Sequence, residues 1–357
     1  MGVPEQTGSR RGVAWFAGVE ASGVLEVVDV RLQPERLVTP GWWAVVGDFE
    51  GRVRAWRFAD VAASAPAAPG PWVGPSPEAW TSSLDRAQYV AAVERVRAHI
   101  EEGDVYQANV CRMLSAPLAG EPDARALGAV LDAGNPAPYS GGVHVPGEAW
   151  VVSASPELYL RIADGIVTSG PIKGTAATAE AMTDKDRAEN IMITDLVRND
   201  LQRVCAPGTV EVTTLLGEEH HPGLVHLVST VQGVLAEDVA SAPDLWARLL
   251  DATYPPGSVS GAPKSSALDV IDALEPVARG PYCGAVGWVE VAVDGSVRAE
   301  LAVGIRTFWW ADDVLRFGTG AGITWGSDAQ SEWAETALKA ARLVALASGG
   351  DAGLVTD

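Results

Sequence analysis

The sequence predicts an α+β fold in which antiparallel β-sheets pack together and helices lie on the outside. Two observations lead to this prediction. Short runs of alternating apolar and polar residues, which are typical of half-buried strands, recur along the whole chain. Long helical patterns are few, and they do not alternate regularly with the strands as a parallel α/β sheet would require.

The predicted strands begin near the N-terminus, where residues 12–60 contain four such runs. Residues 61–79 are rich in alanine, proline and glycine and are typical of a surface linker. The later strands are YQANVCRML, AWVVSAS, LYLRIADGIV, TVEVTTLL, GAVGWVEVAV, VRAELAVGI and LRFGTGAGI. We expect residues 1–75 to be a β-rich region of the same unit as residues 76–357.

Three long helices are predicted. Ser83 is a candidate N-cap for the first, which carries an apolar stripe at helical spacing and ends at Gly103. The second covers residues 184–204. Thr183 precedes it and Asp186 follows three residues later, which resembles a capping box with Asp in place of Glu. The third covers about 329–347.

The composition excludes several classes of protein. The chain has 26 basic and 46 acidic residues and a net charge of −20, so a basic nucleic-acid-binding face is not expected. No apolar run approaches the length of a membrane span, and the N-terminus lacks the apolar core of a secretory signal. The three cysteines are widely spaced, which favours a reducing cytoplasm without disulfides.

Two pairs of carboxylates are candidates for a metal site. Asp186 and Glu189 are three residues apart on one predicted helix, and Glu332 and Glu335 have the same spacing on another. If the two helices approach each other, the converging charges would need a cation, most naturally Mg²⁺. Acids at this spacing are also common on solvated helix faces, and spacing alone favours that alternative.

Lys173 lies in TSGPIKGTAAT, a run of small uncharged residues that offers its ammonium no partner. A desolvated lysine can act as a nucleophile or base, whereas an exposed one would be an ordinary turn residue. Arg306 lies in an otherwise apolar strand and needs either a substrate carboxylate or a salt bridge. His226 is a lone histidine in an apolar segment, where a hydrogen-bonded core histidine is the usual outcome.

Two glycine-rich segments, 254–266 and 317–328, match neither common nucleotide-binding pattern. Their backbone N–H groups could bind a carboxylate, or the segments could simply form hairpin turns.

Taken together, residues from about 84 to 346 resemble the chorismate-utilising enzymes, which include anthranilate synthase component I, aminodeoxychorismate synthase component I, isochorismate synthase and salicylate synthase. The matching segments are GDVYQANV (103–110), SASPELYL (153–160), PIKGT (171–175), DRAENIMITDLVRNDLQRV (186–204), HLVST (226–230), GSVSGAPKSSALDVIDALEP (257–276), YCGAVGW (282–288), GIRT (304–307), GAGITWGSD (320–328) and EWAETALKA (332–340). The resemblance implies the fold of these enzymes, with residues 76–357 as the catalytic region.

Within this family, two positions discriminate between activities. Lysine-dependent aminodeoxychorismate synthases carry the lysine of PIKGT, here Lys173, where anthranilate synthases typically have alanine. Isochorismate- and salicylate-forming members carry a lysine where this sequence has Gln107. The resemblance therefore implies amination at C4 of chorismate.

The family mechanism assigns roles to these residues. Lys173 would attack C2 of chorismate, and Glu157 would protonate the departing C4 hydroxyl. Glu189 and Glu335 would hold Mg²⁺, with Asp186 and Glu332 in the outer shell through water. The residues expected to contact the substrate are Gln107, Thr175, His226, Ser258, Tyr282, Arg306, Gly320, Gly322 and Lys339.

The sequence contains no glutaminase signature, because its cysteines lie inside the synthase motifs. The resemblance thus implies a separate class I glutamine amidotransferase that supplies ammonia. Two alternatives remain: amination at C2, as in anthranilate synthase, and a non-catalytic subunit that binds chorismate or tryptophan. The sequence also departs from the family, because TAAT follows PIKG where basic residues are usual, Ser258 replaces a threonine, and residues 1–75 match poorly.

Overall fold

The computed structural model describes residues 10–63, 70–176, 178–221 and 224–350, excluding the side chains of 175–176, 220–221 and 224. Its strands are β1 (Arg10–Phe16), β2 (Val19–Asp29), β3 (Gly41–Gly47), β4 (Val53–Ala63), β5 (Thr81–Ser82), β6 (Gln107–Pro117), β7 (Tyr139–Val145), β8 (Ala149–Ser155), β9 (Leu158–Ala163), β10 (Ile166–Gly170), β11 (Ile172–Ala176), β12 (Glu211–His221), β13 (Leu224–Val234), β14 (Gly261–Ala262), β15 (Ala285–Val291), β16 (Val297–Val303), β17 (Thr307–Ala311) and β18 (Val314–Ile323). The α-helices are α1 (Arg86–Glu102), α2 (Ala124–Gly134), α3 (Asp184–Gln202), α4 (Glu237–Ala240), α5 (Leu245–Thr253), α6 (Lys264–Leu274) and α7 (Ala329–Ala347), with short 3₁₀ turns at Pro34–Val38, Pro77–Ala79, Ala179–Ala181 and Gly257–Val259.

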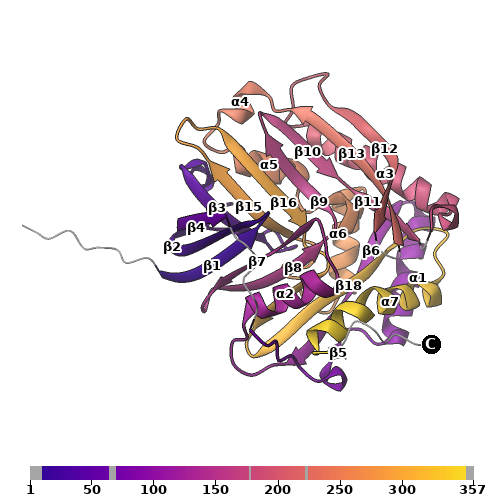
Figure 1. Cartoon of the computed structure of the whole chain (residues 1–357). Coiled ribbons are helices and arrows are strands. Elements are labelled where there is room, and N and C mark those ends of the chain that lie inside the picture. Colours follow the sequence, from indigo (N-terminus) through magenta and orange to yellow (C-terminus); the bar gives the residue numbers. More distant parts are fainter. Residues whose placement is uncertain (1–9, 64–69, 177, 222–223, 351–357) are drawn as a thin grey trace, which may run out of the picture.

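All strand pairs in the described part of the chain are antiparallel and belong to one continuous hydrogen-bonded path. From one end, the path runs β6, β18, β17, β8, β7 and β1. It continues through β2, β4, β3 and β15 to β16, β9, β10 and β13. Strands β11 and β12 each pair with β13 at this end. The N-terminal strands therefore join the two halves of the sheet (Figure 1).

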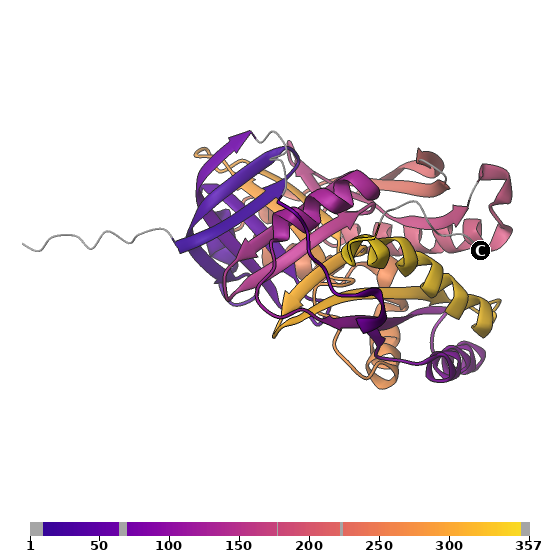
Figure 2. The same cartoon turned by 60° about the horizontal axis from the view of Figure 1, so that its bottom comes forward.

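The helices cover the outside of the folded sheet (Figures 1 and 2). Helices α2 and α7 pack over β8, β17 and β18, and their core includes Leu127, Phe308 and Leu343. Helix α1 packs on β6 and α7, whereas α3 packs on β11, β12 and β13. This arrangement confirms the predicted antiparallel α+β architecture with helices outside.

The helix boundaries confirm some predictions and correct others. Thr183 caps α3 in a complete capping box with Asp186, and Gly103 ends α1 in the left-handed conformation, as predicted. Ser83 is not the N-cap of α1. Asp85 caps this helix in a capping box with Gln88, and the Ser83 hydroxyl accepts a hydrogen bond from the backbone of Met113 instead. Asp85 directly precedes the helix, so its carboxylate can accept a hydrogen bond from the backbone N–H of Gln88, the third residue of α1.

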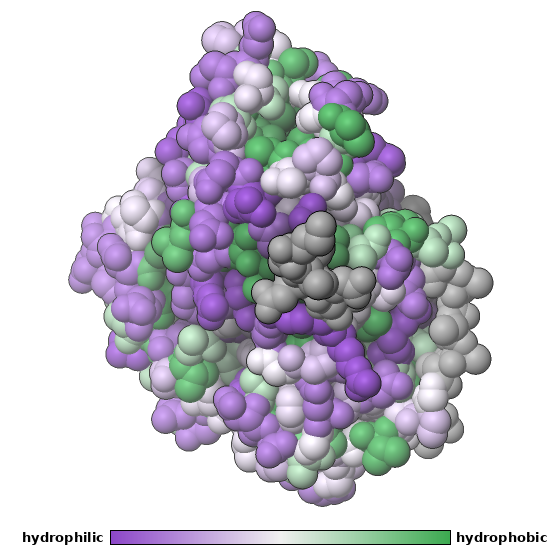
Figure 3. Space-filling view, turned by 90° about the vertical axis from the view of Figure 1, so that its left-hand side faces the viewer, coloured by the Kyte–Doolittle hydropathy of each residue, from purple (hydrophilic) through white to green (hydrophobic). Residues whose placement is uncertain are grey.

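The end of the molecule that carries the N-terminal strands has a mainly hydrophilic surface (Figure 3). Its hydrophobic residues lie in small separate groups, as on most soluble domains. Among the described residues, no helix is both long and apolar enough to cross a membrane.

Candidate active site

The candidate site lies where the two ends of the folded sheet meet. Lys173 extends from β11 at one end, and Gly322 lies on β18 at the other. A Cβ atom on Gly322 would be 3.3 Å from Lys173 Nζ and only 2.4 Å from Gln107 Nε2. Because Gly322 has no side chain, the side chains of Lys173 and Gln107 can approach β18 closely.

The surroundings of Lys173 make its neutral form easier to reach. Burial lowers the pKa of its ammonium group, since a charged amine loses hydration there. The carboxylates of Glu189, Glu157 and Glu335 act against this shift, and the nearby charge of Lys339 adds to it. A neutral amine at this position can act as a nucleophile.

Glu157 lies close to Lys173 and is only 3% exposed. Burial raises the pKa of its carboxyl group to about 7, while hydrogen bonding from Ser258, the charge of Lys173 and the backbone of Ile172 act in the opposite direction. At neutral pH a large fraction of this group is thus protonated. Glu157 is suited to act as a general acid beside a lysine nucleophile.

Asn190 fixes the position of the strand that carries Lys173. Its amide donates to the backbone carbonyls of Lys173 (3.3 Å) and Leu227 (2.9 Å), and its Oδ1 accepts from the hydroxyl of Ser229 (2.5 Å). These bonds join α3 to β11 and β13. The next residue, Gly174, has a φ of +90°, which a side chain would strain.

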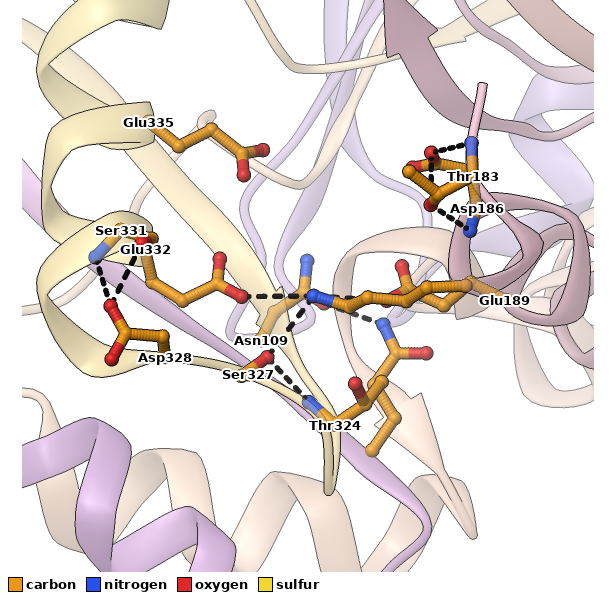
Figure 4. A network of polar contacts seen from close by, with 12 residues as sticks. Asn109, Thr183, Asp186, Glu189, Thr324, Ser327, Asp328, Ser331, Glu332 and Glu335 are labelled. Carbon is orange, nitrogen blue, oxygen red and sulfur yellow. Dashed lines mark hydrogen bonds and ion pairs between the residues drawn. The ribbon is translucent and has the colours of Figure 1, made fainter. Parts of the chain in front are cut away.

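Glu189 on α3 faces Glu332 on α7 (Figure 4), and the ammonium of Lys185 lies within ion-pair distance of both carboxylates. Its ammonium is 3.1 Å from Glu332 Oε1 and 3.7 Å from Glu189 Oε1. Glu335 also acts on this ammonium, although its own ion pair is with Lys339 at 2.6 Å. The cluster thus needs positive charge, and Lys185 supplies it.

Asp186 is turned away from this cluster toward the start of α3 (Figure 4). Its carboxylate accepts hydrogen bonds from the backbone N–H of Thr183 at 2.9 Å and from the Thr183 hydroxyl at 2.6 Å. The structure therefore gives Asp186 a capping role and leaves three carboxylates around Lys185.

These three carboxylates offer the oxygen ligands that a divalent cation prefers, and an ammonium lies between two of them in this structure. The resemblance assigns the ion to Glu189 and Glu335, with Glu332 in the outer shell, whereas the ammonium of Lys185 pairs with Glu332 and Glu189. In the described part of the chain, the one set of three acidic or histidine side chains with ligand atoms all within 4.8 Å is the largely exposed group His99, Glu102 and Asp104. The predicted carboxylates would therefore have to draw together around the metal.

Arg306 is positioned to bind an anion. It does not lie in a strand as predicted but at the junction of β16 and β17, with a φ of +51°. Burial lowers the pKa of its guanidinium, and it forms no ion pair within the described residues. An unpaired, desolvated guanidinium is a good partner for a substrate carboxylate. The alternative of a structural salt bridge has no partner among these residues.

Gln107 and Asn109 form a buried polar pair next to Gly322. Gln107 Nε2 donates to Asn109 Oδ1 at 3.3 Å, and Asn109 Nδ2 donates to the carbonyl of Ser258 at 3.4 Å. The Oε1 atom of Gln107 is buried without a hydrogen-bond partner. It is available to accept a hydrogen bond from a bound molecule.

The remaining predicted residues occupy different surroundings. Lys339 donates a 3.3 Å hydrogen bond to the carbonyl of Gly320, which lies in β18 near the site. The Tyr282 ring lies against Gly318, and its hydroxyl is 4.0 Å from Cys111 Sγ. His226 is 2% exposed in β13, and its backbone pairs with that of Thr175. The Thr175 side chain is outside the described residues.

Two important residues were not predicted. Lys185 has four acidic residues within six positions of the sequence, so an ordinary surface ion pair was the natural expectation. Asn190 is part of the DRAEN motif, and its position on the buried face of α3 was the available signal. Their roles depend on contacts with α7, β11 and β13.

Comparison with known proteins identifies the family. A family model described as chorismate binding enzyme matches residues 51–345. The chain therefore belongs to the chorismate-binding enzyme family, as its sequence motifs imply.

Relatives with different named activities have similar identity to this chain. It is 39% identical over 276 residues to anthranilate synthase component 1 of Streptomyces coelicolor, covering 73% of this chain and 52% of that protein. It is 34% identical over 278 residues to aminodeoxychorismate synthase component 1 of Klebsiella aerogenes, covering 74% of this chain and 59% of that protein. The chain thus spans less than two thirds of these relatives.

Solved structures support the fold. Anthranilate synthase component I of Streptococcus pneumoniae has a TM-score of 0.74 at 24% identity, covering 96% of this chain and 93% of the other. The menaquinone-specific isochorismate synthase of Escherichia coli has a TM-score of 0.76 at 20% identity, covering 96% and 90%. The predicted chorismate-binding fold is confirmed.

Proposed function

We propose that this protein aminates chorismate at C4, forming 4-amino-4-deoxychorismate, as component I of aminodeoxychorismate synthase. The observation that carries the proposal is the pairing of Lys173, whose amine is desolvated, with Glu157, whose carboxyl pKa is about 7. A nucleophile and an acid side by side suit a reaction in which one carbon is attacked while a hydroxyl departs from another.

In the proposed first step, neutral Lys173 Nζ forms a bond to C2. Both ring double bonds shift, from C1=C2 to C1=C6 and from C5=C6 to C4=C5, and the C4–O bond breaks. Glu157 gives its proton to the departing oxygen, which leaves as water. In the second step, ammonia bonds to C4 and both ring double bonds shift back. The C2–Nζ bond then breaks with its electron pair returning to Lys173. The surplus proton on the new amine passes to the Glu157 carboxylate.

Other residues would hold the substrate. Arg306 offers an unpaired guanidinium to a carboxylate of chorismate. Mg²⁺, when bound by Glu189 and Glu335 with Glu332 nearby, would neutralise the other carboxylate. Gln107 stands where water-activating relatives have lysine, so it favours amination over hydration.

We further propose that ammonia comes from a separate glutamine amidotransferase subunit, in the cytoplasm. The product would serve 4-aminobenzoate and folate formation, or a secondary metabolite made from the same intermediate.

The test is product analysis after incubation with chorismate, MgCl₂ and ammonium chloride. We expect 4-amino-4-deoxychorismate from the wild-type protein and a loss of about a thousandfold in rate for Lys173→Ala, because the covalent step is removed. Fluorescent anthranilate formed without an added lyase would replace this proposal with C2 amination, which the relatives named anthranilate synthase make the second candidate. No turnover with bound chorismate would indicate a regulatory subunit.

A further inference from the structure

Gln107 keeps a polar atom buried without a partner. The side chain has no exposed surface, and its carbonyl oxygen Oε1 accepts no hydrogen bond from the described residues. Such an atom lowers the stability of the folded state, because it has lost its hydration and gained no bond in return. A donor that reaches this oxygen only during the reaction would satisfy it.

The hydrogen bonds around Gln107 decide which end of its amide is free. The backbone carbonyl of Ser258 can only accept, so Asn109 presents Nδ2 to it at 3.4 Å. Asn109 Oδ1 then faces Gln107 and accepts a hydrogen bond from Nε2 at 3.3 Å. The end that remains is the carbonyl oxygen. The free group of Gln107 is therefore an acceptor and not a donor.

This free acceptor lies in the same corner of the site as the amine of Lys173. The position of a Cβ atom on Gly322 would be 2.4 Å from Gln107 Nε2 and 3.3 Å from Lys173 Nζ, so both side chains end close to one point on β18. Gln107 is neutral, and it brings no charge that would hold Lys173 as an ammonium. A carboxylate at position 107 would do so.

The proposed reaction places a positive charge on the nitrogen of Lys173 for part of each cycle. When neutral Nζ bonds to C2, it keeps both of its protons and becomes a substituted ammonium. It must retain them, because the C2–Nζ bond later breaks with its electron pair, and a neutral amine leaves far more readily than an amide anion. The adduct therefore needs an acceptor that stabilises its N–H groups without removing their protons.

We propose that Gln107 is a catalytic residue whose Oε1 accepts a hydrogen bond from Lys173 Nζ while that nitrogen is bonded to C2. The proposal rests on the covalent C4 amination described above. An amide carbonyl suits this task, because it accepts hydrogen bonds well but is too weak a base to deprotonate an ammonium near neutral pH. Since the bond forms only as the charge develops, it lowers the barrier without tightening the binding of chorismate.

Gln107→Met tests this role, because it keeps the length of the side chain and removes the carbonyl. Steady-state rates are measured with chorismate, MgCl₂ and ammonium chloride. The adduct on Lys173 is measured by mass spectrometry after an acid quench in the absence of ammonium. We expect kcat to fall about a hundredfold and the adduct about tenfold, while the KM for chorismate stays within about twofold.

Urea unfolding separates this role from a structural one. Gln107→Met should be at least as stable as the wild type, because the substitution removes an unsatisfied buried atom. Gln202→Met, which removes an exposed amide from α3, is the control and should change neither kinetics nor stability.

A second variant acts through the orientation of the amide. Asn109→Leu removes the acceptor that holds Gln107 Nε2, so the amide can turn its carbonyl away from Lys173. We expect kcat to fall about tenfold with the KM for chorismate within about twofold. This variant decides the question if Gln107→Met does not fold.

A wild-type kcat in folded Gln107→Met, or in Asn109→Leu, would overturn the role of Gln107 while C4 amination stands. A loss of stability in Gln107→Met with an unchanged amount of adduct would overturn it too, since the residue would then be structural. If the wild-type protein forms anthranilate, or if Lys173→Ala keeps its activity, the proposed function fails, and the role of Gln107 fails with it.

Discussion

At the scale of single residues, burial acts in opposite directions on the pKa values of Lys173 and Glu157 and brings the two values closer together. The pKa of the amine falls and that of the carboxyl rises, because in both cases the charged form is poorly solvated. Each residue limits the shift of the other through its charge. Burial therefore favours the neutral amine of Lys173 and the neutral carboxyl of Glu157, which are the forms that a nucleophile and a general acid require.

The raised pKa of Glu157 predicts a pH-dependent cost to stability. Its pKa rises from 4.5 to about 7 on folding, so the folded state binds the proton more tightly than the unfolded state. The contribution of this group to the free energy of unfolding is fully present below about pH 4.5 and is lost as the pH rises through 7. Glu157→Gln should therefore be more stable than the wild type at pH 8, by up to about 3 kcal/mol, and nearly equal at low pH.

Urea unfolding at pH 5 and pH 8 measures this difference. Glu101→Gln, which changes an exposed acid on α1, is the matched control and should show no such trend. A Glu157→Gln difference that is the same at both pH values would contradict the prediction.

The position of Lys185 predicts that its ammonium competes with Mg²⁺ for the carboxylates of Glu189 and Glu332. If Mg²⁺ binds at the proposed metal site, this ammonium must first leave Glu189 and Glu332. Because the side chain is 42% exposed, we expect a modest effect: Lys185→Met should bind Mg²⁺ about fivefold more tightly, equivalent to about 1 kcal/mol.

Calorimetric titration with MgCl₂ measures this affinity. Arg187→Met removes the same charge two residues along α3, where no ion pair to these carboxylates exists in the described structure. Equal Mg²⁺ affinities in the Lys185 and Arg187 variants would contradict the predicted competition between Lys185 and Mg²⁺.

Sequence motifs selected Lys173 and Glu157 as candidates, since both lie in segments that the family shares, and the structure places the two groups near each other. Motifs gave less information about which side chains contact each other. Asp186 and Glu189 have the spacing of a shared helix face, yet Asp186 is committed to Thr183 because the first turn of a helix has unsatisfied N–H groups. Local spacing does not decide between a cap and a ligand.

At the scale of elements, α3 contributes most to the site. Its first turns carry Lys185 and Glu189, and Asn190 fastens it to β11 and β13. The capping box between Thr183 and Asp186 holds the start of this helix. We therefore expect the order of these first turns to affect the proposed metal site.

Removing the cap tests this link. Thr183→Ala should lower the free energy of unfolding by about 1 kcal/mol. Asp85→Ala, which breaks the equivalent capping box of α1, should cost a similar amount. We expect only Thr183→Ala to weaken Mg²⁺ binding in calorimetry, and equal Mg²⁺ affinity in both variants would argue against the link.

The three long helices and most strands follow from sequence periodicity, and α7 has the predicted bounds. Helices α2, α5 and α6 were not predicted, because each has only 9 to 11 residues and they are defined by packing on the sheet. The glycine-rich appearance of 254–266 concealed the start of α6 at Lys264. Arg306 was placed in a strand because a positive φ leaves no mark in an apolar pattern.

At the scale of the whole molecule, one buried ion pair connects distant parts of the chain. Arg279 is 1% exposed and pairs with Glu275 at 2.6 Å. The same guanidinium donates to the carbonyls of Val259 and Asn109 and lies 4.1 Å from the centre of the Phe49 ring. It thus ties the turn between β3 and β4 to the end of α6 and to β6.

Arg279→Met should therefore be severely destabilising. It leaves the Glu275 carboxylate buried without its partner, which costs about 3–5 kcal/mol. Arg298→Met removes an exposed arginine from its pair with Glu290 and should cost under about 1 kcal/mol. Urea unfolding compares the two, and similar losses would show that the buried pair is not specially important.

The meeting of the two sheet ends has a consequence for how the molecule could be divided. The contact between Lys185 and Glu332 joins residues 147 positions apart, and the exposed turn around Val293 lies between them in the chain. Cutting there would give a fragment carrying Lys173, Lys185 and Glu189 and another carrying Gly322, Glu332 and Glu335. Each fragment would hold one wall of the site, and turnover would become a direct readout of their reassembly.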